Sequence, residues 1–225
     1  MYFNSMLKVA VNGFGRIGRT AFKIALDKYQ GKIGIVAIND LTDPKTLAHL
    51  LKYDSNFGKW GKEVTADAGN IIIEGKSYPV LAEKEPNKLP WKDKKVDVVI
   101  ESTGRFTDKA GAGLHLKAGA KRVIISAPVK STSEVKTYIL GVNASKYSNE
   151  EVISNSSCTT NCIAPVAAVV NMKFGIVKAM MTTVHSYTAD QNLQDGPHRD
   201  LRRARAAAQN IVPTTSGAAI STTET

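Results

Sequence analysis

The sequence predicts an α/β protein whose first part is a doubly wound, mostly parallel sheet. Between residues 7 and 155, short apolar runs alternate with segments of helical periodicity, which is typical of parallel strands joined by crossover helices. A second observation is a G-x-G-x-x-G pattern placed between the first apolar run and the first helical segment. Together the alternation and the glycine pattern predict a nucleotide-binding sheet.

The first predicted unit is a strand, a glycine turn and a helix. Leu7 to Val11 is a short apolar run, and Gly13, Gly15 and Gly18 follow it before a helical segment begins. In this pattern the first glycine permits the tight turn, the second lets the backbone approach a pyrophosphate, and the third lets the helix lie close to the strand. The free N–H groups of the helix start would then face the phosphates. Glycine turns are common, so the pattern needs support from its surroundings.

Asp40 supplies that support at the end of the second predicted strand. It lies 22 residues after Gly18 and closes the run "IGIVAIND". A carboxylate at this place can accept hydrogen bonds from the adenosine ribose hydroxyls, and it would repel a 2′-phosphate. The sequence therefore favours NAD over NADP, although Asp40 could also be a strand-end residue that starts the next turn.

The remaining apolar runs extend the predicted sheet. A hairpin is expected from Asn70 to Ile73 and Tyr78 to Leu81, and a helix from Asp108 to Ala118, with a shorter helix after Val129. Further strands are expected at Val96 to Glu101, Val123 to Ser126, Tyr138 to Leu140 and Val152 to Asn155. Ligands bind beyond the carboxyl ends of such strands, where Ser102, Thr103 and Ser126 fall.

Charge and apolar content limit the class of protein. Lys and Arg number 30 against 20 for Asp and Glu, a formal charge of +10, and the lysines are spread along the chain. A diffuse excess suits phosphorylated small molecules at least as well as nucleic acid, and no nucleic-acid-binding module accompanies it. No apolar run reaches the ~20 residues that cross a bilayer, and no signal-peptide layout precedes the first strand. We expect a cytoplasmic protein without a membrane or nucleic-acid partner.

Both cysteines lie in the stretch "NSSCTTNCIAP". Ser157 suits a helix N-cap, and a helix of small and apolar residues is predicted from Cys158 to Val170. Cys158 would lie in the first turn, where the helix dipole favours the thiolate. Cys162 would follow one turn later and is expected to be buried.

Three interpretations of the cysteines compete. A disulfide is disfavoured because two positions four apart in a helix are poorly aimed for bridging. A metal site is disfavoured because too few further ligands lie nearby, so we predict no metal. A nucleophile needs a base, and His185 lies toward the end of an expected strand in "MMTTVHSYTAD". A lone histidine in a strand is more often structural, so spacing alone leaves this choice open.

Eight motifs together resemble the phosphorylating, NAD-dependent glyceraldehyde-3-phosphate dehydrogenases, in order from Met6 to Ala219. They are "KVAVNGFGRIGR", "AINDLTD", "LLKYDSNFGKW", "ESTGRF", "RVIISAP", "SCTTNCIAP", "HSYTADQ" and "PTTSGAA". The resemblance implies a Rossmann-type NAD-binding domain over residues 6–156. It implies the first part of an α+β catalytic domain over residues 157–225, incomplete at its end.

The resemblance also implies a mechanism. The family's cysteine, matched by Cys158, attacks the aldehyde of D-glyceraldehyde 3-phosphate, and the thiohemiacetal passes hydride to NAD. Inorganic phosphate then cleaves the thioester to 1,3-bisphosphoglycerate, with His185 as the base. The residues that match the family's cofactor site are Gly13, Gly15, Arg16, Ile17, Gly18, Asp40, Lys84 and Ser126. Those that match its two phosphate sites are Ser157, Thr159, Thr188, Ser216 and Gly217, with one arginine of the 202–205 cluster.

The family match carries further expectations and alternatives. The segment from Gln191 to Arg205 resembles the family's S-shaped loop, which implies a homotetramer. Ala189 departs from the family's asparagine, and after "SGAA" the chain reads "ISTTET" instead of continuing as the family does. We therefore expect a piece of a longer protein. Erythrose-4-phosphate dehydrogenase, with the same thiol and histidine, and a nucleotide-binding module without turnover stay open as alternatives.

Overall fold

The computed structural model of the chain describes residues 6–129 and 134–225. These residues form two units, which meet in the sequence between Ser157 and Cys158. All strands of the described residues belong to the first unit. The short helix expected after Val129 falls on residues 130–133, outside the described ranges.

The first unit contains a nine-stranded sheet in the order β10-β11-β9-β8-β1-β2-β7-β6-β5. From β7 to β10 all neighbours are parallel, whereas β5, β6 and β7 are antiparallel. The strands are β1 (Leu7–Asn12), β2 (Ile33–Asn39), β5 (Val64–Ala66), β6 (Asn70–Ile73), β7 (Lys76–Leu81), β8 (Val98–Glu101), β9 (Arg122–Ile125), β10 (Lys136–Thr137) and β11 (Val152–Ser154). Leaving the two-residue β10 aside, the parallel strands follow the order 3-2-1-4-5-6 of dinucleotide-binding folds. The predicted α/β class is confirmed.

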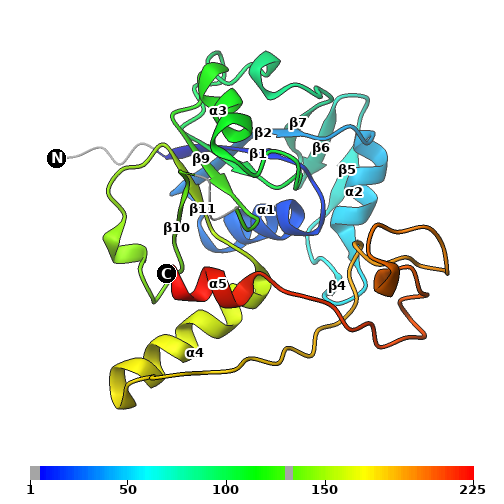
Figure 1. Cartoon of the computed structure of the whole chain (residues 1–225). Coiled ribbons are helices and arrows are strands. Elements are labelled where there is room, and N and C mark those ends of the chain that lie inside the picture. The colour runs from blue at the N-terminus through cyan, green and yellow to red at the C-terminus, as the bar shows by residue number, and fades with distance from the viewer. Residues whose placement is uncertain (1–5, 130–133) are drawn as a thin grey trace. The chain divides into compact units, whose positions relative to one another are not determined.

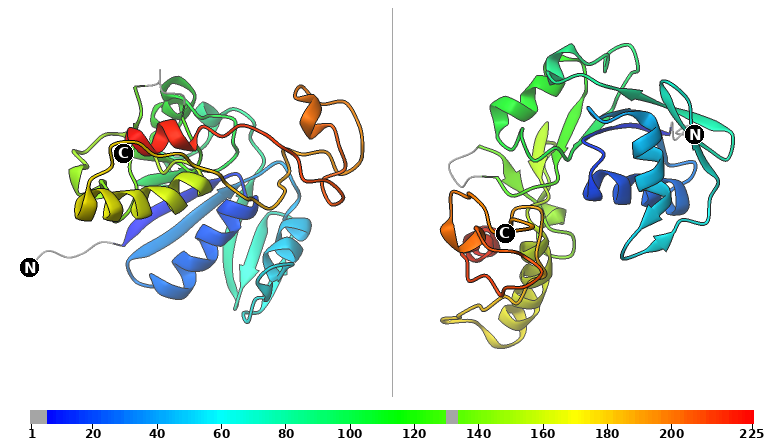
Figure 2. Two further views of the ribbon diagram at one scale, coloured as in Figure 1. Left: turned by 60° about the horizontal axis from the view of Figure 1, so that its bottom comes forward. Right: turned by 90° about the vertical axis from the view of Figure 1, so that its right-hand side faces the viewer.

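Helices cover both faces of this sheet (Figures 1 and 2). They are α1 (Arg16–Lys28), α2 (Pro44–Lys52) and α3 (Lys109–Lys117). Successive residues of β1 alternate between the two faces: Val9 and Val11 pack with Phe22 of α1, whereas Ala10 packs with Ala112 of α3. Because side chains alternate between the two faces of a strand, β1 contributes residues to two separate hydrophobic cores.

The glycine turn between β1 and α1 is held by close backbone contacts. Gly13 has a φ of +89°, and a Cβ on it would lie 2.6 Å from the backbone nitrogen of Thr103, just beyond β8. A Cβ on Gly18 would lie 2.1 Å from the carbonyl oxygen of Gly13. Both positions therefore require glycine, one for conformation and space and the other for space alone. The chain leaves β1 for β2 on one side and reaches β8 on the other, which makes this turn the switch point of the sheet.

The second unit is helical and irregular. It contains α4 (Cys158–Phe174), the 3₁₀ turn η3 (Leu201–Arg203) and α5 (Ala218–Thr223), and α4 packs against α5. The helix predicted to begin at Cys158 is confirmed, and it continues past Val170. A short two-stranded sheet of β3 (Tyr53–Asp54) and β4 (Gly58–Lys59) belongs to the first unit.

Two predicted strands are wrong. The segment that leads to His185 is extended but unpaired, and Val177 and Val184 are almost fully exposed. A strand needs a hydrogen-bonded neighbour, and no other part of the described residues 158–225 forms one. The strand expected from Tyr138 to Leu140 ends earlier, as β10, because the N–H of Ile139 donates to Oδ1 of Asn143 and leaves the ladder.

We expect Gly18→Ala to destabilise the first unit by about 1–3 kcal/mol, because the methyl group would overlap a backbone oxygen. Gly113→Ala in α3 is the matched control, since a Cβ there meets nothing within 4 Å. It should stabilise the protein by about 0.5–1 kcal/mol through helix propensity. Urea titrations followed by circular dichroism give both values, and equal midpoints for the two variants would contradict the packing argument.

Candidate active site

The predicted cofactor residues of the first unit lie along one edge of the sheet. Gly13 follows β1, Asp40 follows β2, and Ser126 follows β9. Lys84 lies three residues beyond the end of β7 and is exposed. Because β1, β2, β7 and β9 are parallel members of one sheet, their carboxyl ends share an edge. The structure therefore brings these four positions to one side of the first unit.

Asp40 holds the glycine turn. Its Oδ2 accepts a hydrogen bond from the backbone N–H of Phe14 at 2.7 Å, and its Oδ1 accepts one from Thr42 at 2.9 Å. Phe14 lies between Gly13 and Gly15, so the carboxylate fixes the turn from β2. Gly15 is exposed and is the N-cap of α1, with open space around it. The two features leave the start of α1 open to an anion.

Arg16 and Ile17 form the first turn of α1, and both are exposed. The Arg16 guanidinium pairs with Asp54 at 2.8 Å. Backbone N–H groups of Asn56 and Phe57, with Arg16, hold the pKa of Asp54 at about 2. The ion pair is exposed on the arginine side, and such pairs contribute little to stability. It orients Arg16 across the β3–β4 turn.

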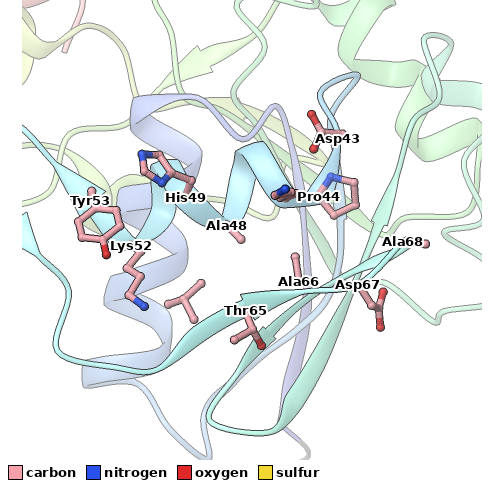
Figure 3. A pocket seen from close by; sticks show the side chains of 12 residues that line it. Asp43, Pro44, Ala48, His49, Lys52, Tyr53, Thr65, Ala66, Asp67 and Ala68 are labelled. Carbon is pink, nitrogen blue, oxygen red and sulfur yellow. The ribbon is translucent and has the colours of Figure 1, made fainter.

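A surface pocket of about 680 Å³ lies elsewhere in the first unit, between α2 and β5 (Figure 3). Pro44 to Lys52 form one wall, and Val64 to Ala68 form the other. The rings of His49 and Tyr53 lie 5.0 Å apart beside it. None of the predicted cofactor residues lines this pocket, so it is distinct from the glycine turn.

The second unit brings Cys158 and His185 together. Cys158 is the first residue of α4, and its Sγ lies 3.3 Å from Nε2 of His185, 27 residues later. Nδ1 of His185 lies 2.6 Å from the carbonyl oxygen of Ser186. A carbonyl only accepts, so Nδ1 carries a proton and Nε2 faces the thiol. The arrangement is that of a nucleophile with an oriented base.

The electrostatics of this pair favour an ionised thiol. The hydrogen bond from His185 lowers the pKa of Cys158, and Thr159 contributes a smaller effect in the same direction. The hydrogen bond to the Ser186 carbonyl raises the pKa of His185, and the bond to Cys158 adds to it. Both pKa shifts favour the thiolate and the imidazolium, and the thiolate is the reactive form of a cysteine.

Cys162 is exposed, and the expectation that it is buried is wrong. Of the residues of α4, Thr160 and Ala164 are the buried ones. Cys158 and Cys162 are both free thiols. Only Cys158 lies beside a histidine.

The predicted substrate residues are less closely gathered. Thr159 Oγ1 lies 4.0 Å from Sγ of Cys158. The Thr188 hydroxyl accepts a hydrogen bond from the N–H of Asp190, and the N–H of Thr188 donates to the side-chain oxygen of Gln191. The Ser216 hydroxyl accepts a hydrogen bond from the N–H of Ala218. Gly217 is the N-cap of α5, and Ser157 is the residue before α4. Thr159 is thus the member of this group with an observed side-chain contact to the cysteine.

The arginines of the 202–205 cluster are paired with acids of the same loop. Arg202 contacts Asp200 at 2.8 Å and Arg205 contacts Asp195 at 2.8 Å. Arg203 pairs with Asp190 and also donates to Thr214. Each pair is exposed, so together they shape the loop more than they stabilise it.

Two family models match separate parts of the chain. Residues 7–109 match the family model "Glyceraldehyde 3-phosphate dehydrogenase, NAD binding domain". Residues 157–224 match "Glyceraldehyde 3-phosphate dehydrogenase, C-terminal domain". The chain belongs to the glyceraldehyde-3-phosphate dehydrogenase family. The family resemblance deduced from the motifs is confirmed.

Individual relatives agree with the family models. The chain is 55% identical to "Glyceraldehyde-3-phosphate dehydrogenase 1" of Bacillus cereus, over 95% of this chain and 64% of that protein. It is 57% identical to "Glyceraldehyde-3-phosphate dehydrogenase" of Geobacillus stearothermophilus, over 95% of this chain and 63% of that protein. The chain thus spans a little under two thirds of the length of these dehydrogenases. Their names do not favour the erythrose-4-phosphate alternative.

Two observations stand beside the family match. Among the described helices, none combines the length and the apolar content that crossing a bilayer requires.

Sequence reasoning also missed a buried polar cluster of Asn12, Glu101, His115 and Trp91. Its one signal in the sequence is a carboxylate at the end of the apolar run "VVIE".

The Cys158–His185 contact predicts a measurable pH profile. In a Cys162→Ser background, the rate of alkylation by iodoacetamide should rise with pH through a midpoint below the ~8.5 of an ordinary thiol. His185→Asn should move the midpoint upward, because the imidazolium that favours the thiolate is gone. Mass spectrometry of the alkylated chain gives the rate at each pH.

His198→Asn is the matched control for this profile. His198 lies in the same unit, and its ring contacts the backbone of Asp200 instead of a cysteine. Its replacement should leave the midpoint in place. The same midpoint in the parent and in His185→Asn would refute the assigned role of the contact.

Proposed function

We propose that this chain carries the nucleophile and the dinucleotide turn of an enzyme that oxidises D-glyceraldehyde 3-phosphate to 1,3-bisphosphoglycerate with NAD and inorganic phosphate. The observation that carries the proposal is the 3.3 Å contact between Cys158 Sγ and His185 Nε2 at the start of a helix. The family match and the names of the relatives support it.

The residues around the glycine turn fit NAD. Gly13 and Gly18 leave no room for side chains, and Gly15 exposes backbone at the N-terminus of α1. The first turn of α1 contains no acidic residue, so its partial positive charge is available to a pyrophosphate. Asp40 presents a carboxylate at the end of β2, suited to ribose hydroxyls. We assign Arg16, Ile17, Lys84 and Ser126 to the same site from the family motif.

Cys158 and His185 would perform the covalent chemistry. The Cys158 thiolate attacks the aldehyde carbon, and a C–S bond forms as the carbonyl oxygen gains negative charge. Protonated His185 gives its proton to that oxygen, which forms the thiohemiacetal and leaves His185 neutral, and the backbone N–H at the start of α4 is suited to the developing oxyanion. His185 then takes the hydroxyl proton as the carbon is oxidised. NAD, when bound, supplies the hydride acceptor for this step.

The thioester that results is resolved by inorganic phosphate. A phosphate oxygen attacks the thioester carbon, the C–S bond breaks, and Cys158 leaves as a thiolate stabilised by protonated His185. We assign Ser157, Thr159, Thr188, Ser216 and Gly217 to the two phosphate sites, since hydroxyl and backbone N–H groups suit phosphate oxygens. This list follows the family motif.

The wider assignments belong to the same proposal. Residues 6–156 would form the NAD-binding domain, and residues 157–225 would belong to the catalytic domain. We place the enzyme in the cytoplasm as a homotetramer, with the loop from Gln191 to Arg205 at a subunit contact. The ion pairs within that loop would give it a defined shape for such a contact.

The nucleophile assignment predicts the result of a simple substitution. Cys158→Ser should lower NADH formation from glyceraldehyde 3-phosphate, NAD and phosphate by about a thousandfold or more, because a serine hydroxyl is not ionised here. Acetyl phosphate should acetylate the parent chain, by attack of the Cys158 thiolate on the acyl carbon with release of phosphate. Intact mass spectrometry detects this half-reaction without NAD.

Cys162→Ser is the control, since its thiol lies in the same helix without a histidine beside it. It should still accept the acetyl group, whereas Cys158→Ser should not. An acetyl group found at Cys162, or a parent chain that neither acquires acetyl nor forms NADH, would exclude the proposed chemistry.

The Asp40 assignment makes a separate prediction. Asp40→Ala should weaken NAD binding about tenfold or more, because hydrogen bonds to a charged group contribute about 1.5–3 kcal/mol. The preference over NADP should shrink at the same time. Calorimetric titration with both nucleotides measures the two effects. Asp67→Ala is the control, since Asp67 caps the β5–β6 turn. A variant of Asp40 with parental NAD affinity would contradict the assignment.

A further inference from the structure

A buried polar cluster underlies the glycine turn. Asn12 ends β1, Glu101 ends β8, and His115 lies on the buried face of α3. Trp91 precedes β8 and is fully buried, and none of the four is more than 1% exposed. Buried polar groups are costly unless they are hydrogen-bonded. The hydrogen-bond partner of each polar group in the cluster therefore decides how these four side chains are oriented.

The hydrogen bonds of His115 run in one direction. Trp91 Nε1 lies 2.9 Å from His115 Nδ1, and an indole N–H can only donate. Nδ1 is therefore the acceptor, and the ring proton lies on Nε2. Nε2 in turn lies 2.9 Å from Oε2 of Glu101 and donates to it. Trp91 thus fixes His115 as one neutral tautomer.

Glu101 accepts four hydrogen bonds. Its Oε2 accepts from His115 and from Nδ2 of Asn12 at 2.6 Å. Its Oε1 accepts from the backbone N–H of Thr103 at 2.8 Å and from the Thr103 hydroxyl. A carboxylate can take four such bonds. Both oxygens of Glu101 are therefore fully used as acceptors.

The chain of hydrogen bonds continues from the end of β1 to the end of β2. Asn12 Oδ1 accepts from Nδ2 of Asn39 at 2.7 Å, since the Asn12 amide nitrogen is turned toward Glu101. Asn39 Oδ1 then accepts from the N–H of Glu83 at 2.9 Å, and Asn39 Nδ2 also donates to the Glu83 carbonyl. Glu83 precedes Lys84. The Glu101 carboxylate and the Glu83 backbone therefore fix the amide orientations of Asn12 and Asn39 from the two ends of the network.

The cluster also sets the glycine turn. The Thr103 N–H that Glu101 accepts is the atom that a Cβ on Gly13 would approach to 2.6 Å. The neighbouring Ser102 hydroxyl donates to the Gly13 carbonyl at 2.7 Å. Glu101 thus holds the loop after β8 through Thr103, and this loop in turn contacts the turn after β1 at Gly13.

We propose that Glu101, fixed by neutral His115 and Trp91, is a positioning residue for the dinucleotide turn. Its carboxylate holds Gly13, the Thr103 loop and the segment before Lys84 in the arrangement that binds the nucleotide. The identity of that nucleotide as NAD rests on the proposed function. Glu101 itself is buried and acts through these backbone segments.

Glu101→Gln tests the direction of the network. The new amide group places N–H donors where either His115 and Asn12 or the two Thr103 groups already donate. We expect NAD binding to weaken about tenfold or more, by calorimetric titration at a temperature where the variants are folded. Trp91→Phe frees His115 Nδ1 to hold the proton, so Nε2 can accept from the new amide. This relieves one of the two donor–donor contacts at that position, and the contact with Asn12 Nδ2 remains.

The double variant gives the decisive comparison. Glu101→Gln with Trp91→Phe should bind NAD more tightly than Glu101→Gln alone, whereas a role in packing alone would give a double variant that binds NAD no more tightly than Glu101→Gln. ¹⁵N NMR of His115 in the parent should show a protonated Nε2 and an unprotonated Nδ1. The opposite tautomer, a double variant that binds NAD no more tightly than Glu101→Gln, or parental affinity in Glu101→Gln would overturn the proposal.

The parent chain separates this test from that of the proposed function. A parent that does not bind NAD contradicts the proposed function and the positioning role together. A parent that binds NAD as tightly as Glu101→Gln contradicts the positioning role alone. The His115 tautomer is read without nucleotide, so it tests the network in both cases.

Discussion

The contact of two backbones at Gly13 is the constraint on which the first unit depends. A side chain there would overlap the backbone after β8, and one on Gly18 would overlap Gly13 itself. The backbones of strand β1, helix α1 and the segment after β8 therefore approach one another closely at these two glycines. The exposed start of α1 follows from that closeness, because Gly15 can then present its backbone to a ligand. Asp40 secures the turn from the neighbouring strand.

Much of the first unit was predictable because its signals are local. The glycines, the apolar run from Leu7 and the acid at position 40 each act through a few neighbouring residues. Most predicted strands begin and end within roughly two residues of their observed bounds, as boundary assignments normally do. Helix α4 was predictable for the same reason, since Ser157 and the small apolar residues after it form a local helix pattern.

Two of the errors concern features that depend on distant partners. Whether residues 176–188 form a strand depends on a neighbour that no local pattern specifies, and the burial of Cys162 depends on what covers α4. The pairing of Cys158 with His185 could be proposed from residue types and the family motif. The distance between their side chains could not be predicted, because the two residues lie 27 positions apart in the sequence. The Glu101 cluster was invisible because its meaning lies in the direction of each hydrogen bond. The indole of Trp91, a pure donor, fixes that direction at one end of the network, and the Glu83 backbone fixes it at the other.

The ion pairs of the arginine-rich loop affect how the protein attracts anions. Arg202, Arg203 and Arg205 each have an acid at their guanidinium group, so their charges largely cancel beyond a Debye length of ~8 Å. The excess of +10 is then carried mainly by lysines spread over the surface. Such a field has no single focus. It speeds the diffusional approach of small anions in general, and added salt weakens it, while selection among those anions falls to short-range contacts.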